Sequence, residues 1–103
     1  MIRKVRWSQD ALNDLKSVLS YIDFENPVAA RRVALTLDET ANALGKFLTG
    51  RPGRHLGTYE KSVQNLPYVI AYEIWTLGTE ETVMIIRVIH SARNWPKGAW
   101  PEN

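Results

Sequence analysis

Cationic and imidazole side chains gather where an apolar run of the chain ends. Residues 85–96 read IIRVIHSARNWP, and they carry Arg87, His90 and Arg93 close together. Arginine stabilises negative charge and histidine transfers protons near neutral pH, so these residue types could serve phosphate chemistry. The run is therefore a catalytic corner, a docking place for another protein, or a strand end with polar caps.

Each of these side chains also has a purely structural interpretation. A part-buried arginine needs a counter-charge, and the cross-strand candidate for Arg87 is Glu73. His90 ends an apolar face, where a histidine is usually hydrogen-bonded and structural, whereas His55 lies in a polar loop and is expected to be solvated. Arg51 and Arg54 could form an anion clamp or merely add solubility.

The Glu60 carboxylate is expected to order the loop that carries Arg51 and Arg54. Glu60 follows the Gly/Pro-rich stretch 49–57, and we expect it to pair with an arginine such as Arg54. Two histidines 35 positions apart, in a chain without cysteine, match no metal-ligand spacing, so neither a metal site nor a cofactor is expected.

Two amphipathic helices are predicted to form a hairpin before these residues. Residues 2–7 favour a short strand, and Ser8 is a candidate N-cap for a helix that ends near Glu25. Asn26 and Pro27 suit the cap and first position of a second helix. Its apolar stripe runs to Leu48.

Three closely spaced strands are predicted after the loop. They cover residues 58–64, 68–75 and 82–90, and short turns between them favour an antiparallel meander. Strict alternation places Val83, Ile85, Arg87 and Ile89 on one face of the last strand. The order β-α-α-β-β-β predicts an α+β fold of two layers, with the helical hairpin packed on an antiparallel sheet. We expect a single domain over 1–103, with an irregular tail over 91–103.

The order of these elements and five short motifs resemble one known family, the ParE-type toxins of the RelE/ParE toxin–antitoxin superfamily. The motifs follow one another along nearly the whole chain: Trp7, Ser8, Ala11, Asp14 and Leu15; Tyr21, Ile22, Asn26, Pro27, Ala29 and Ala30; Gly53, Arg54, Gly57, Thr58 and Glu60; Pro67, Tyr68, Ile70 and Tyr72; and His90, Arg93, Trp95 and Pro96. The resemblance implies the RelE/ParE-like fold and a toxin that a co-expressed antitoxin holds inactive.

Two modes of action occur among similar proteins, namely inhibition of DNA gyrase and ribosome-dependent cleavage of mRNA. A ribonuclease needs a proton acceptor, a proton donor and cations for the phosphorane. The candidates for that alternative are Arg54, Lys61, Arg87 and His90, but no tyrosine follows His90. The sequence therefore favours a non-enzymatic gyrase inhibitor without catalytic residues; a third possibility is a chain that only binds its antitoxin.

A non-enzymatic inhibitor needs binding surfaces, and arginine and aromatic side chains commonly anchor them. The candidates for contact with the target are Arg51, Arg54, Arg93, Trp95 and Trp100. The candidates for contact with the antitoxin, in a groove between hairpin and sheet, are Tyr21, Phe24, Phe47, Leu48 and Arg87.

Composition agrees with a small folded domain and narrows the setting. The chain has 103 residues, 45% of them hydrophobic and 23% charged, and no cysteine, so disulfides and thiolate chemistry are excluded. A net charge of +2 suits an acidic protein partner. The N-terminal residues show no signal peptide, and we expect a cytoplasmic protein.

Overall fold

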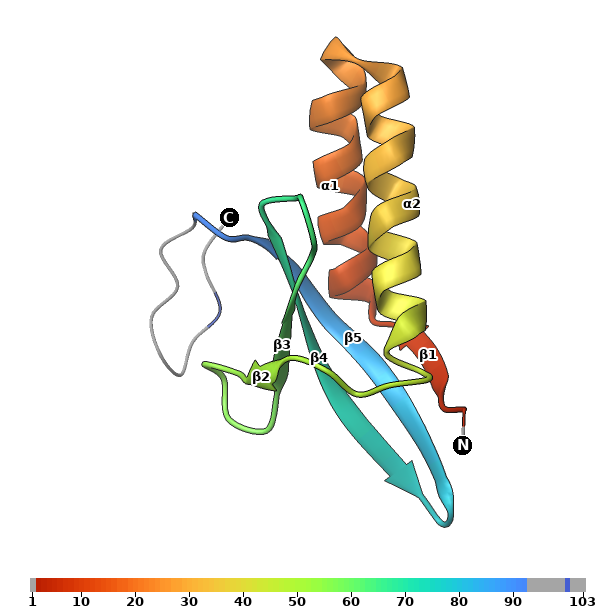
Figure 1. Ribbon diagram of the computed structural model, residues 1–103. Helices are drawn as coiled ribbons and strands as arrows, with labels where there is room; N and C mark the ends of the chain where they lie inside the picture. Colours follow the sequence, from red (N-terminus) through yellow and green to blue (C-terminus); the bar gives the residue numbers. More distant parts are fainter. Residues whose placement is uncertain (1, 93–99, 101–103) are drawn as a thin grey trace.

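The computed structural model describes residues 2–92 and 100, and these form a helical hairpin that stands against a twisted sheet (Figure 1). Strand β1 covers Lys4–Trp7, helix α1 covers Gln9–Glu25 and helix α2 covers Pro27–Ala43. Four strands follow: β2 (Arg51–Pro52), β3 (Tyr59–Ser62), β4 (Tyr68–Leu77) and β5 (Glu80–His90). This two-layer α+β architecture confirms the predicted fold class.

Both helices begin where their capping residues predict, but α2 ends at Ala43, before the end of the predicted apolar stripe at Leu48. The Ser8 side chain accepts a hydrogen bond from the Ala11 N–H (3.1 Å), which begins α1. Asn26 ends α1 and caps α2 by accepting from the Ala29 N–H (3.1 Å), with Pro27 at the first helical position. These bonds join residues three apart, so local sequence is sufficient to predict them.

The sheet has the strand order β1-β5-β4-β3-β2, and all pairs except one are antiparallel. The exception is β1, which runs parallel to β5 and pairs over Thr82–Ile85. The meander of three strands is thus confirmed, whereas β2 is a two-residue strand inside the predicted loop. Alternation along a strand indicates which side chains share a face, but it does not indicate the neighbouring strand.

A register shift in the β4–β5 pair changes which residues share a face. Ala71 lies opposite Arg87 and Tyr72 opposite Ile85, so Ile86 has no partner on β4. Val83 and Ile85 therefore share the helix-facing core with Val88 instead of Ile89. Strict alternation was the wrong prediction for this strand because it does not allow for an extra residue.

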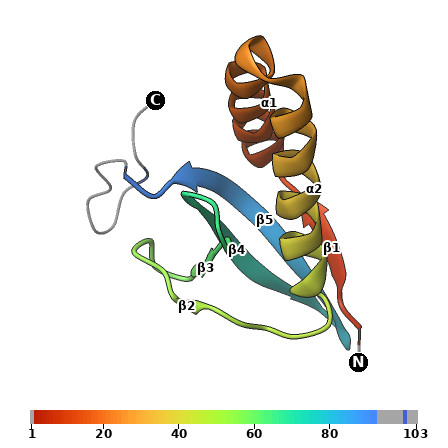
Figure 2. The same ribbon diagram turned by 45° about the horizontal axis from the view of Figure 1, so that its top comes forward.

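The main core lies between the hairpin and the sheet (Figure 2). Its buried residues come from both helices and from β3–β5 or their connections: Ala11, Val33, Leu37, Ala41, Leu44, Val63, Ile70, Tyr72, Val83, Ile85 and Val88. Trp7 is partly buried and packs against this core. A smaller cluster of Val69, Ala71 and Ile89 lies apart from it, and Trp100 packs against that cluster.

Candidate functional site

A cleft opens along β5 where its pairing with β1 ends. Strand β1 stops opposite Ile85, and the chain then turns at Ser8 into α1. Helix α1 takes the place of a further strand beside the last residues of β5. The cleft has a volume of about 720 Å³. Side chains of α1, β4 and β5 line it together with Ala92, which follows β5: Asn13, Asp14, Ser17, Val18, Tyr21, Ile22, Tyr68, Arg87, Val88, Ile89, His90 and Ala92.

Two polar residues of the α1 region anchor it to the edge of β5. The Ser8 hydroxyl donates to the Ile86 carbonyl (3.0 Å), and the Ser8 N–H donates to the Ile85 carbonyl (2.9 Å). Six residues further on, Asp14 Oδ2 accepts from the Val88 N–H (2.9 Å). The helix therefore satisfies strand-edge groups that a neighbouring strand would otherwise bind.

The base of the cleft holds a bidentate ion pair between helix and strand. Arg87 Nε donates to Asp14 Oδ2 (2.7 Å), and a terminal guanidinium nitrogen donates to Asp14 Oδ1 (3.1 Å). The two side chains are only 13% and 11% exposed. The hydrogen bond to Asp14 raises the pKa of Arg87, and burial opposes this effect.

This pair corrects the prediction that Arg87 bonds to Glu73. The register places Met84 opposite Glu73, and Glu73 accepts instead from the Trp75 indole N–H (2.9 Å). The unpaired Ile86 separates the two charged positions, and the counter-charge of Arg87 comes from a helix 73 positions away. Spacing between neighbouring strands could not reveal it.

Aromatic side chains form the wall and the rim of the cleft. The Tyr68 ring meets His90 edge-on with 5.4 Å between ring centroids, and the His90 Nδ1 accepts from the Ala92 N–H (3.1 Å). Burial, with a smaller contribution from Tyr21, raises the pKa of Tyr68. The expected hydrogen bond to His90 is confirmed, although its side chain is exposed.

The predicted antitoxin contacts do not all lie at this cleft. Tyr21 lines it and is 82% exposed, while Phe24, 92% exposed, lies near the tip of the hairpin. Phe47 and Leu48 follow α2 and lie at the opposite end of the hairpin. The Gly45 carbonyl at this end accepts from the Arg3 N–H, which places the segment next to β1. The sequence set is thus divided over separate regions.

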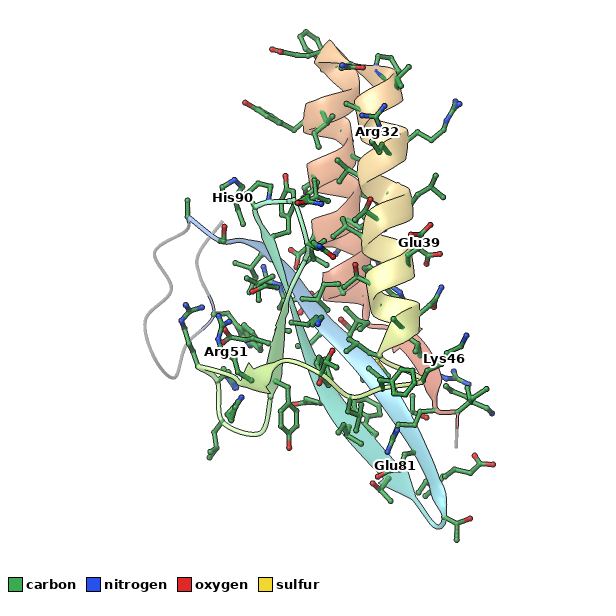
Figure 3. The ribbon with its side chains drawn as sticks, in the orientation of Figure 1. Arg32, Glu39, Lys46, Arg51, Glu81 and His90 are labelled. Atoms are coloured by element: carbon green, nitrogen blue, oxygen red, sulfur yellow. The ribbon has the colours of Figure 1, made fainter. Side chains whose placement is uncertain are left out.

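The loop with β2 is built around a buried carboxylate. Glu60 is 1% exposed and accepts from the Arg54 N–H (2.6 Å), the Arg54 guanidinium (3.3 Å) and the Arg51 guanidinium (3.1 Å). The predicted pairing of Glu60 with Arg54 is confirmed. Figure 3 shows Arg51 at this loop and His90 at the far end of β5.

His55 differs from its predicted solvated state. Its ring stacks on Trp100 with centroids 4.6 Å apart and an interplanar angle of 8°. Its Nδ1 is buried and has no hydrogen-bond partner among the described residues. This contact joins the β2 loop to the C-terminal region; Arg93, Trp95 and most of the predicted tail lie outside the described residues.

The four residues of the ribonuclease alternative do not meet at one place. Arg87 and His90 line the cleft, whereas Arg54 belongs to the β2 loop. Lys61 lies on β3 opposite Ile70. Sequence reasoning did not assign Asp14 and Tyr68 to the cleft, although both belong to the motifs that carry the family resemblance.

Within the described residues, no three His, Asp or Glu side chains gather in a way that could hold a metal ion, and no helix is long and apolar enough to cross a membrane.

Comparison with known families gives one match over most of the chain. The model of the family described as "ParE toxin of type II toxin-antitoxin system, parDE" matches residues 5–95. A putative toxin, Y4kP of Sinorhizobium fredii, is 33% identical over 92% of this chain and 95% of its own length. Toxin RelE2 of Caulobacter vibrioides is 34% identical over 87% of this chain and 97% of its own.

Solved structures show the same fold. A chain of the chromosomal ParDE system from P. aeruginosa superposes with a TM-score of 0.77 at 16% identity, covering 86% of this chain and 96% of that chain. A chain of the toxin–antitoxin complex RelBE2 from Mycobacterium tuberculosis superposes with a TM-score of 0.56 at 26% identity, covering 87% and 92%.

Proposed function

Because the chain belongs to the ParE toxin family of type II toxin–antitoxin systems, we propose that it is a non-enzymatic inhibitor of DNA gyrase that a cognate antitoxin neutralises. Gyrase acts on chromosomal DNA, so the proposed site of action is the cytoplasm. The ParE family model supports gyrase over other targets.

The state of Arg87 is the observation that carries the proposal. A phosphate-stabilising arginine must present its guanidinium to the substrate. Two of the Arg87 nitrogens are instead bonded to Asp14 in a part-buried pair. Arg54 and Lys61 lie on other elements, so the cations needed for a phosphorane are not assembled around His90.

The proposed contact surface for gyrase is the β2 loop with Trp100. Arg51 and Arg54 remain 53% and 42% exposed while Glu60 orders their loop. Trp100 stacks on His55 beside them. Arginines on a preordered loop lose little conformational entropy on binding, and arginine and tryptophan are common anchors of protein interfaces. Arg93 and Trp95 belong to the same proposal from sequence alone.

The proposed contact surface for the antitoxin is the cleft beside α1. Apolar and aromatic side chains line it, and an antitoxin segment could enter as a helix or an added strand. Tyr21 at the rim and Arg87 at the base are its predicted contacts. The net charge of +2 favours an acidic segment.

The purified full-length chain tests the target directly. We expect it to inhibit supercoiling of relaxed plasmid by gyrase and to trap cleaved plasmid when the reaction is stopped with denaturant. Arg51→Gln should weaken both effects, while Lys46→Gln, on an exposed residue after α2, should leave both unchanged. Thermal unfolding of each variant separates lost contact from lost fold. Unimpaired gyrase at high toxin concentration contradicts the proposal.

Ribosome-dependent cleavage of mRNA is the alternative function, and one structural observation favours it. Arg87 and His90 line the same cleft, and a relative named RelE2 is 34% identical. Mapping of mRNA ends on programmed ribosomes checks this alternative. New 5′ ends within the ribosome-bound codon, lost in His90→Ala, would establish the ribonuclease.

A further inference from the structure

Helix α2 carries an exposed face that no other described element covers. Helix α1 packs on one side of α2, and α2 has no element beyond it on the other side in either view (Figures 1 and 2). Val28 and Leu35 lie on this outer face and are 65% and 57% exposed. They are seven residues apart, which places them on one stripe of the helix.

Four charged side chains surround Leu35 in a symmetric pattern. Arg31 and Glu39 lie four residues before and after it, and Arg32 and Asp38 lie three residues before and after it. Positions three and four residues away are the neighbours of a residue on a helix surface. Figure 3 labels Arg32 toward the tip of the hairpin and Glu39 nearer its base. We name these five residues the α2 face.

The charge pattern contributes little to the stability of a single chain. Among the described residues, none of the four charged side chains forms an ion pair, and Asp38 accepts only a long bond from Asn42 (3.3 Å). The two arginines are on the N-terminal side and the two acids on the C-terminal side. This order is opposite to the one that the helix dipole favours.

A twofold axis at Leu35 would pair every one of these charges. If two α2 helices pack antiparallel with Leu35 on the axis, the Arg31 and Arg32 end of each copy lies beside the Asp38 and Glu39 end of the other copy. Each contact occurs twice, as a self-complementary interface requires. The same register sets the two Leu35 side chains together, which removes apolar surface from water.

We propose that the α2 face is a homodimer interface and that its occupant is the α2 face of a second copy of this chain. One helix pair covers less than the about 1,200 Å² that stable interfaces bury, so the dimer is weak and depends on concentration. The cleft is lined by α1, β4, β5 and Ala92, and α2 contributes nothing to it. The dimer therefore presents two open clefts, and the proposal does not rest on the identity of the target.

Charge reversal in the full-length chain tests the pairing. The variant R31E/R32E makes the α2 face wholly acidic, and D38R/E39R makes it wholly basic. Sedimentation velocity over a range of concentrations should show the wild type dimerising and each variant at least tenfold weaker, because each now repels itself. A mixture of the two variants should form a heterodimer, and the variant with all four reversals should dimerise again.

A matched reversal elsewhere is the control. Lys4 and Glu80 are exposed on β1 and β5, so K4E/E80K reverses one positive and one negative charge on the sheet and leaves α2 unchanged. It should dimerise like the wild type. Circular dichroism checks that each variant is folded. A monomeric wild type at all concentrations, unchanged dimerisation of either self-repelling variant, or no heterodimer in the mixture would overturn the proposal.

Discussion

Asp14 and Arg87, 73 positions apart in the chain, form a bidentate ion pair that joins α1 to the edge of β5. The same carboxylate also accepts from the Val88 N–H (2.9 Å). One side chain therefore neutralises a part-buried charge and satisfies a strand-edge donor. This double role explains why α1 lies beside β5 where β1 no longer does.

Loss of the Asp14 charge should destabilise the fold. Asp14→Asn leaves the Arg87 guanidinium without its counter-charge, and we expect the free energy of unfolding to fall by about 2–3 kcal/mol. Urea denaturation measures the loss. The more exposed Arg3–Glu81 pair is the comparison, because Arg3→Gln should cost less than about 1 kcal/mol. Equal losses in the two variants would contradict the assigned role.

Removal of the Ser8 hydroxyl should cost more than removal of a cap alone. Ser8→Ala loses the bond from the Ala11 N–H and the bond to the Ile86 carbonyl. Asn26→Ala loses the side-chain cap of α2. We expect about 1 kcal/mol for Asn26→Ala and about 2 kcal/mol for Ser8→Ala. Thermal unfolding of both variants side by side provides the measurement.

Substitution of Glu60 should loosen the β2 loop before it unfolds the domain. Glu60→Gln weakens the bonds to both arginines and to the Arg54 N–H. We expect faster hydrogen exchange at the Arg54 amide and a loss of about 1.5–3 kcal/mol in the free energy of unfolding. Unchanged exchange at that amide would show that Glu60 does not order the loop.

Two glycines in the left-handed region should respond differently to alanine. Gly50 has a φ of 113°, and an added Cβ would clash with the Glu60 carbonyl oxygen. Gly78 has a φ of 63°, and an added Cβ would meet no atom within 4 Å. Gly78→Ala should cost about 1 kcal/mol from backbone strain, and Gly50→Ala should cost clearly more. Chemical denaturation ranks the two variants.

Stability should fall in alkaline solution partly through Tyr72. Burial, with a smaller contribution from Tyr59, raises the pKa of Tyr72 above its ordinary value of 10.0, and its hydroxyl donates to the Thr49 carbonyl (2.7 Å). The unfolded state loses this proton first as pH rises. The contribution is therefore complete below about pH 10 and disappears as pH rises through the folded pKa.

The variant Tyr72→Phe tests this sign. Its free energy of unfolding should be lower than that of the wild type at pH 8, by about 1 kcal/mol for the lost hydrogen bond. Above pH 10 the difference should narrow, because only the wild type loses the contribution of this phenol. A difference that stays constant with pH would contradict the assignment.

Interactions between residues close in sequence were predictable. The caps at Ser8 and Asn26 follow from residue type and a spacing of three. The pairing of Glu60 with Arg54 spans six positions and was predicted from the loop alone. The strands of the meander follow from their spacing and turns. In each case the chain between the partners allows few alternatives.

Interactions between distant residues were not predictable from the residues alone. The sequence indicated Glu73, on the neighbouring strand, as the counter-charge of Arg87, whereas the structure supplies Asp14. The extra residue at Ile86 and the position of α1 decide between them. The stacking of His55 on Trp100 likewise depends on how the C-terminal region returns to the β2 loop.

The sequence by itself determined the helices, the meander and the family, because caps, periodicity and short motifs act over a few residues. The tertiary structure decided which residues share the cleft, which carboxylate neutralises Arg87, and that β1 lies parallel to β5. The physical reason is that local patterns limit backbone conformation and side-chain face. The choice among distant partners depends on register and on the packing of whole elements.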